Sequence, residues 1–148
     1  MNVNFELVTD LQGLTRRDFT VASRDLVNPT NVNPIIDGEF VFLNTGYQLV
    51  RASTGGPGWA VFAERGRFDV QALGKLTVLQ LNPYEADTTV FTAAGLALGG
   101  KVKISSAVDF GGQSKSGLAA YDSGEVIGFV TRLPQDNGGR LRFVQTLF

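Results

Sequence analysis

The acid–base chemistry open to this chain is limited, because its 148 residues include no histidine and no cysteine. Those two residue types carry most proton transfer near neutral pH, most thiol chemistry and most zinc or iron–sulfur ligation. Their absence excludes Ser-His-Asp and Cys-His catalysis and disulfide bonds. We therefore predict a protein that is not an enzyme, uses no metal and no cofactor, and holds, coats or binds another molecule.

Carboxylates remain as the acid–base candidates. Glu85 and Asp87 stand two residues apart beside Tyr84, and a glycosidase could use such a pair if its carboxyl groups had the required separation. Three further carboxylates sit at turns, where Asp commonly accepts hydrogen bonds from nearby backbone N–H groups: Asp37, Asp122 and Asp136. A structural role is favoured over a catalytic one for all of them.

Two other ligand motifs are weak. The run Gly111–Gly117 (GGQSKSG) has glycines and a lysine but lacks the adjacent Gly-Lys-Ser/Thr of a phosphate-binding loop, so a flexible surface loop is expected. Calcium could bind Asp, Asn and backbone oxygens, but no Asp-x-Asp-x-Asp-Gly loop is present.

The charge and hydropathy patterns limit the kinds of partner that the protein is expected to bind. The formal charge is −1, with 13 basic and 14 acidic residues, so there is no basic excess to neutralise phosphates and no direct nucleic-acid partner is expected. No apolar run approaches the roughly 20 residues of a membrane-spanning helix. The first ten residues lack the order of a signal peptide, so we expect synthesis without Sec export and no membrane partner.

The elements that would position these residues are strands. Eighteen glycines punctuate short β-rich runs, and helical periodicity is poor, with at most one or two short helical turns, at Asp69–Leu73 and Thr92–Leu98. The expected strands include Glu39–Leu43, Tyr47–Ala52, Trp59–Glu64, Leu76–Leu81, Thr88–Thr92, Lys101–Ser105, Gly124–Arg132 and Leu141–Phe148. This pattern predicts an all-β fold, a small antiparallel β-sandwich or barrel.

The N-terminal residues differ from the rest. Asn28–Pro34 is rich in turn formers, and Asn4–Val8 and Phe19–Ser23 are short strand-like segments. We predict an extended arm over residues 1–34 and a compact β domain over residues 35–148. An ordinary first hairpin of the sheet is the equally supported alternative.

Polar and aromatic residues could also form contacts with a partner. Charge alternates around a tight turn at Glu64–Asp69 (ERGRFD), which contains Arg65, Arg67 and Asp69. This suits either a solvent-exposed ion-pair cluster or a contact between protomers or with a scaffold. Tyr84 and Trp59 could anchor such an interface, although a core position is favoured for the single tryptophan.

Several of these segments resemble parts of the head decoration (capsid cement) proteins of tailed bacteriophages, which have a β-tulip-like fold. The segments are Arg65–Ala72 (RGRFDVQA), Tyr84–Thr88 (YEADT), Gly99–Ser105 (GGKVKIS), Gly124–Arg132 (GEVIGFVTR) and Leu141–Phe148. The resemblance covers most of the chain from about Ile35 onward, and it is one of strands and turns, with no catalytic signature.

The resemblance implies a virion protein made in the host cytoplasm and placed on the outer surface of the expanded capsid. Its partner would be the major capsid protein, and it would act as a homotrimer that bridges capsomers. The arm would add to a strand of the capsid protein through these residues: Asn4, Phe5, Glu6, Leu7, Val8 and Leu11. Arg65, Arg67, Asp69 and Tyr84 would lie at a protomer or capsid interface.

Two alternatives remain open. One is a different virion or tail component, or a β-barrel module that binds protein or glycan. The other is an enzyme that uses carboxylates.

Overall fold

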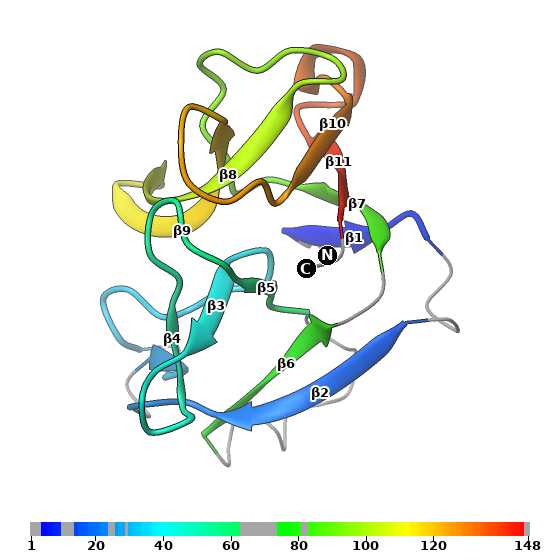
Figure 1. Cartoon of the computed structure of the whole chain (residues 1–148). Helices are drawn as coiled ribbons and strands as arrows, with labels where there is room; N and C mark the ends of the chain where they lie inside the picture. Colours follow the sequence, from blue (N-terminus) through cyan, green and yellow to red (C-terminus); the bar gives the residue numbers. More distant parts are fainter. Residues whose placement is uncertain are drawn as a thin grey trace.

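The chain folds as an all-β protein (Figure 1). The computed structural model describes residues 4–9, 14–23, 26–28, 30–62, 74–80 and 83–146. Regular structure in these ranges is β-strand, apart from 3-10 turns such as η3 (Pro134–Asp136). Within them, no helix is long and apolar enough to cross a membrane. The predicted fold class is confirmed.

A six-stranded antiparallel sheet forms the upper part of the molecule in Figure 1. Its strands, in spatial order, are β1 (Phe5–Leu7), β7 (Tyr84–Thr88), β11 (Leu141–Gln145), β10 (Gly128–Arg132), β8 (Lys101–Phe110) and β9 (Gln113–Ala120). The sheet curls into a half-barrel. A parallel bridge between Phe91 and Leu118 brings the chain beyond β7 against the free edge of β9.

The remaining strands form a second curled layer. They are β2 (Thr15–Thr20), β3 (Phe40–Leu43), β4 (Leu49–Arg51), β5 (Trp59–Ala60) and β6 (Lys75–Gln80), paired as β2–β6 and β4–β3–β5. An antiparallel bridge between Val61 and Val78 connects β5 to β6. A parallel bridge between Val21 and Leu49 connects the end of β2 to β4.

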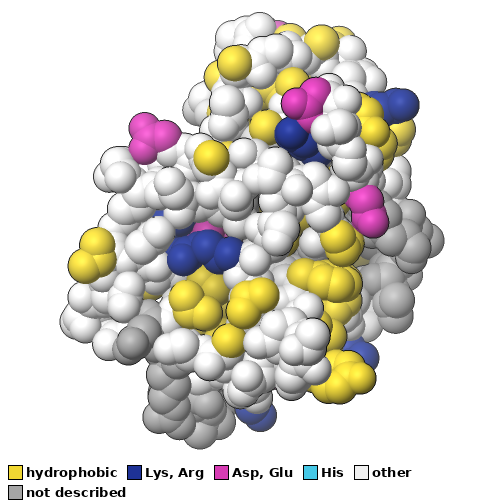
Figure 2. All heavy atoms as spheres, turned by 60° about the vertical axis from the view of Figure 1, so that its left-hand side comes forward, with side chains coloured by type: hydrophobic (Ala, Val, Ile, Leu, Met, Phe, Trp, Pro, Cys, Tyr) yellow, Lys and Arg dark blue, Asp and Glu magenta, His cyan; other side chains and the backbone are white. Residues whose placement is uncertain are grey.

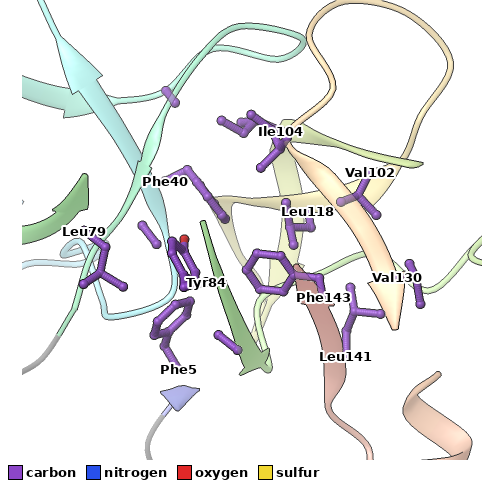
Figure 3. Packing of buried hydrophobic residues seen from close by; sticks show 14 residues of the cluster. Phe5, Phe40, Leu79, Tyr84, Val102, Ile104, Leu118, Val130, Leu141 and Phe143 are labelled. Carbon is purple, nitrogen blue, oxygen red and sulfur yellow. The ribbon is translucent and has the colours of Figure 1, made fainter. Parts of the chain in front are cut away.

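The described residues form two hydrophobic cores. The first lies between the half-barrel and the second layer, which contributes Phe40 of β3 and Leu79 of β6. Figure 3 labels ten of its members: Phe5, Phe40, Leu79, Tyr84, Val102, Ile104, Leu118, Val130, Leu141 and Phe143. The second core is aliphatic: Val21, Val27, Ile35, Val41, Leu49, Val61, Leu76 and Val78. Strand β3 serves both, because successive side chains of a strand point to opposite faces. Phe40 enters the first core and Val41 the second.

The described part of residues 1–34 belongs to this body. Strand β1 pairs with β7, β2 pairs with all of β6, and Phe5 is only 4% exposed. Within the described residues, this segment contributes β1 to the six-stranded sheet and β2 to the second layer, and the two strands do not pair with each other as a hairpin. The Phe5 ring packs edge-on against Tyr84, Phe143 and Phe62.

Two local expectations were wrong. Gly111–Gly117 is not a loop: the turn is confined to Gly111 and Gly112, and Gln113 opens strand β9. The strand placed at Thr88–Thr92 lies at Tyr84–Thr88 instead. The limit of one or two short helical turns holds, since Thr92–Leu98 contains only turns, with the Leu96 N–H donating to Ala93 O. The other expected helical turn, Asp69–Leu73, lies outside the described residues.

Candidate functional site

Strand β7 carries the residues singled out for chemistry, and Tyr84 faces inward. It is 3% exposed, and its ring packs edge-on against Phe5 and Phe143 (Figure 3). Its hydroxyl donates to Gln145 Oε1. Burial raises the pKa of Tyr84 well above its ordinary value, so the phenol stays protonated. The predicted interface residue is a core residue in this structure.

Glu85 and Asp87 bond to different partners. The Glu85 carboxylate accepts a hydrogen bond from Thr131 Oγ1 at 2.7 Å. Asp87 accepts a bidentate pair from Arg142, at 2.8 and 3.1 Å, and a third bond from Asn137 at 2.9 Å. Such a guanidinium fork holds a carboxylate firmly.

These contacts decide the protonation state of Asp87. Partial burial acts to raise the pKa of this carboxyl, but the hydrogen bonds from Arg142 and Asn137 and the charges of Arg142 and Arg140 outweigh burial. The pKa is therefore below its ordinary value, and Asp87 is an ionised acceptor at neutral pH. This geometry joins β7 to β11 and to the turn after η3, and it does not leave Asp87 as a proton donor.

A second group of charges, which the sequence did not reveal, surrounds the fully buried Glu39. Its Oε1 accepts from Arg51 Nε at 2.7 Å and from the Ser116 N–H at 3.0 Å. Its Oε2 accepts from the Ile36 N–H at 2.8 Å and lies 3.8 Å from Lys115 Nζ. One carboxylate thus bonds to β4, to β9 and to its own loop.

Lys115 is 1% exposed and completes this group. Its ammonium donates to Pro34 O at 2.5 Å. Desolvation lowers the pKa of Lys115, although the charge of Glu39 acts in the opposite direction. Nearby, Asn33 Nδ2 donates to Ser114 O at 3.0 Å. The edge of β9 is therefore covered by side chains and loop backbone, which protects it from pairing with another strand.

The predicted arm residues lie along β1 and beside it. The Asn4 backbone N–H donates to Asp37 at 3.0 Å, and Glu6 forms an exposed ion pair with Arg140 at 3.2 Å. Phe5 is buried and Leu7 packs against the first core, whereas Val8 is 43% exposed. Leu11, Arg65, Arg67 and Asp69 lie outside the described residues.

Trp59 sits in an aromatic cluster. Its ring stacks on Phe19 with centroids 5.6 Å apart, and Phe42 approaches it at 4.8 Å. Arg17 lies over the Phe19 ring at 5.2 Å. Trp59 is half-buried against the second core, so much of its surface packs on neighbouring rings.

The face in Figure 2 shows Lys and Arg side chains in small separate groups, between patches of hydrophobic side chains. This surface is not the continuous basic stripe that binds phosphates. No group of three or more His, Cys, Asp or Glu residues that could hold a metal ion occurs in the part of the chain that the structure describes.

The sequence pattern places Tyr47 at the start of a strand, Tyr47–Ala52, but β4 begins at Leu49 and Tyr47 lies at the exposed end of the β3–β4 hairpin. Tyr47 there is 79% exposed and has a φ of 59°, in the left-handed region. Asn44–Thr45–Gly46 reads as an ordinary turn, and no sequence signal places the left-handed residue at the tyrosine after it.

Comparisons with known proteins place the chain in no group. It matches no protein-family model, no curated protein and no solved structure.

Proposed function

We propose that this protein is a structural component of a bacteriophage particle that binds the outer surface of the expanded head and stabilises it by bridging capsomers. The proposal starts from the likeness of its segments to head decoration proteins, several of which fall on strands of the half-barrel: β7, β8, β10 and β11. The all-β body agrees with the fold that this likeness implies.

The use of the carboxylates is the structural observation that carries the proposal. Glu39, Asp87 and Asp37 each accept hydrogen bonds that connect separate elements of the fold. Their lone pairs are engaged in holding strands and loops, which suits a rigid binding body better than acid–base catalysis.

Capsid stabilisation then follows from mass action. A protein that binds only the assembled, expanded shell lowers the free energy of that state and not of the separate subunits. If three copies act together, each contact can be weak, because the second and third binding events take place at a high effective concentration.

The test mixes the purified full-length chain with expanded heads and with unexpanded proheads, and measures co-sedimentation. Saturable binding to expanded heads alone is the expected result, and no binding to either particle would refute the proposal. The full chain is required, because deleting residues 1–25 would remove β1 and β2 and expose both cores.

A further inference from the structure

The backbone of Tyr47 adopts a conformation that disfavours tyrosine. Among the described residues it is the non-glycine with a positive φ, at 59°. The left-handed region brings Cβ close to the following carbonyl oxygen, which glycine avoids and asparagine tolerates. Gly46, immediately before it, does not take that conformation. The strain therefore falls on the aromatic residue although a glycine is next to it.

Hydrogen bonds hold the hairpin tip in this shape. Asn44 Oδ1 accepts from the N–H groups of Gly46, at 2.9 Å, and Gln48, at 3.0 Å. The Tyr47 N–H donates to Asn44 O at 3.0 Å, and the Asn44 N–H donates to Gln48 O at 2.9 Å. The direction in which the tyrosine side chain leaves the backbone is fixed by this network.

Within the described ranges, no hydrogen bond or ring contact of the Tyr47 side chain offsets this strain. Tyr47 is 79% exposed, and within the described ranges neither its ring nor its hydroxyl has a partner. Strained, exposed residues held by a rigid frame are typical of binding sites, and tyrosine is common among residues that dominate binding energy.

We propose that Tyr47 is an anchor that inserts into a recess on the shell protein. This inference rests on the proposed function and names its contact point. The tip, residues 44–48, carries no charged side chain, so the matching recess is apolar with an uncharged polar rim. Its binding should depend little on salt, unlike that of a charged contact. The tip is the end of the β3–β4 hairpin, at the lower left of Figure 1.

The experiment compares three full-length variants with the unaltered protein in binding to expanded heads. Tyr47→Asn should weaken binding at least about tenfold, because it removes the ring. It should leave the thermal midpoint unchanged or raise it by about 1–3 °C, because asparagine fits the left-handed region. Tyr47→Phe should keep most of the affinity. Leu98→Asn is the matched control, since Leu98 is 68% exposed in the β7–β8 loop at the top of Figure 1.

The results test the anchor and the proposed function separately. If the unaltered protein binds heads and Tyr47→Asn binds equally well, the anchor is refuted and the proposed function stands. If Leu98→Asn alone loses binding, the contact lies at the other end of the molecule and the anchor is again refuted. If Tyr47→Asn lowers the thermal midpoint, the tyrosine stabilises the fold, and the premise of the anchor is refuted. If the unaltered protein binds no head, the proposed function fails and the anchor falls with it.

Discussion

At the scale of single residues, the buried carboxylate of Glu39 is paired with two cations, Arg51 and Lys115. Glu39 and Lys115 are almost inaccessible to water, and Arg51 is largely covered. Removing one member of such a group destabilises the fold when the charges that stay buried lose their partners, so the cost depends on how many partners each remaining charge keeps. Removing the carboxylate charge and removing the lysine charge should therefore have different consequences.

We expect Glu39→Gln to lower the free energy of unfolding by about 3–5 kcal/mol, because two cations lose their counter-charge. Lys115→Met should cost much less, since Glu39 keeps Arg51 and the N–H groups of Ile36 and Ser116. Urea denaturation measures both. Glu6→Gln is the control, because its ion pair with Arg140 is exposed and worth under about 1 kcal/mol. Equal losses for the Glu39 and Lys115 variants would contradict this account.

Asp87 should make stability depend on pH. Its pKa in the folded protein lies below the ordinary value of 3.8, so the native state favours the ionised form. The resulting stability is complete above about pH 5 and is lost as the pH falls through the folded pKa. Asp87→Asn should therefore cost about 1–2 kcal/mol at pH 7, and the difference from the unaltered protein should shrink toward pH 3. Urea denaturation at the two pH values checks this, and a difference that does not vary with pH would contradict it.

At the scale of elements, alternation predicted some strands well. Val102 and Ile104 are buried and Lys101 is exposed, as the pattern of Lys101–Ser105 indicates. Strand β9 could not be read in this way, because its buried residues are consecutive, and Lys115, Ser116 and Gly117 precede the single large apolar one, Leu118. A lysine is buried only where distant groups such as Glu39 and Pro34 meet it, and a local pattern does not contain those groups.

Long-range pairing explains the other differences. Phe5 pairs with Thr88 and Arg16 with Leu79, and no property of residues 1–34 by themselves specifies such partners. The same holds for the candidate sites. The pairing of Asp87 with Arg142 needs strands β7 and β11 in register, and the left-handed Tyr47 needs the Asn44 network. Sequence patterns predict single strands, whereas these contacts depend on which strands and turns meet in the folded protein.

The contact between residues 90–92 and strand β9, called the seam below, depends on a glycine. A Cβ at Gly117 would lie 2.3 Å from Val90 O, which is closer than any such contact can be. The missing side chain lets the Leu118 N–H reach Val90 O, at 3.1 Å, and the Thr92 N–H reach Leu118 O, at 2.8 Å.

We expect Gly117→Ala to open this seam and to lower the free energy of unfolding by about 2–4 kcal/mol. Hydrogen exchange at the Leu118 and Thr92 amides should accelerate by more than at amides in β10. Gly46→Ala is the matched control, because a Cβ there would meet its nearest atom at an ordinary 3.4 Å. If both variants exchange like the unaltered protein, the seam does not need Gly117.

At the scale of the whole molecule, the two cores are connected too closely to unfold separately. Strand β3 contributes to both, and Glu39 bonds to Ser116 of the half-barrel. The Gly55 N–H donates to Ile104 O at 3.0 Å, and Ser116 Oγ donates to Ala52 O at 2.9 Å. Opening either layer would break contacts of the other, so a single cooperative transition is expected.

Trp59 is the only tryptophan of the chain and packs against the second core, so its fluorescence reports on that layer. Leu141→Ala removes a fully buried side chain from the first core and should cost about 2–5 kcal/mol. Because the layers are coupled, this change should move the Trp59 fluorescence midpoint in urea as far as the midpoint measured by circular dichroism. Val41→Ala, in the second core, is the reciprocal variant. A fluorescence midpoint that stays in place for Leu141→Ala would show that the two layers unfold as independent units.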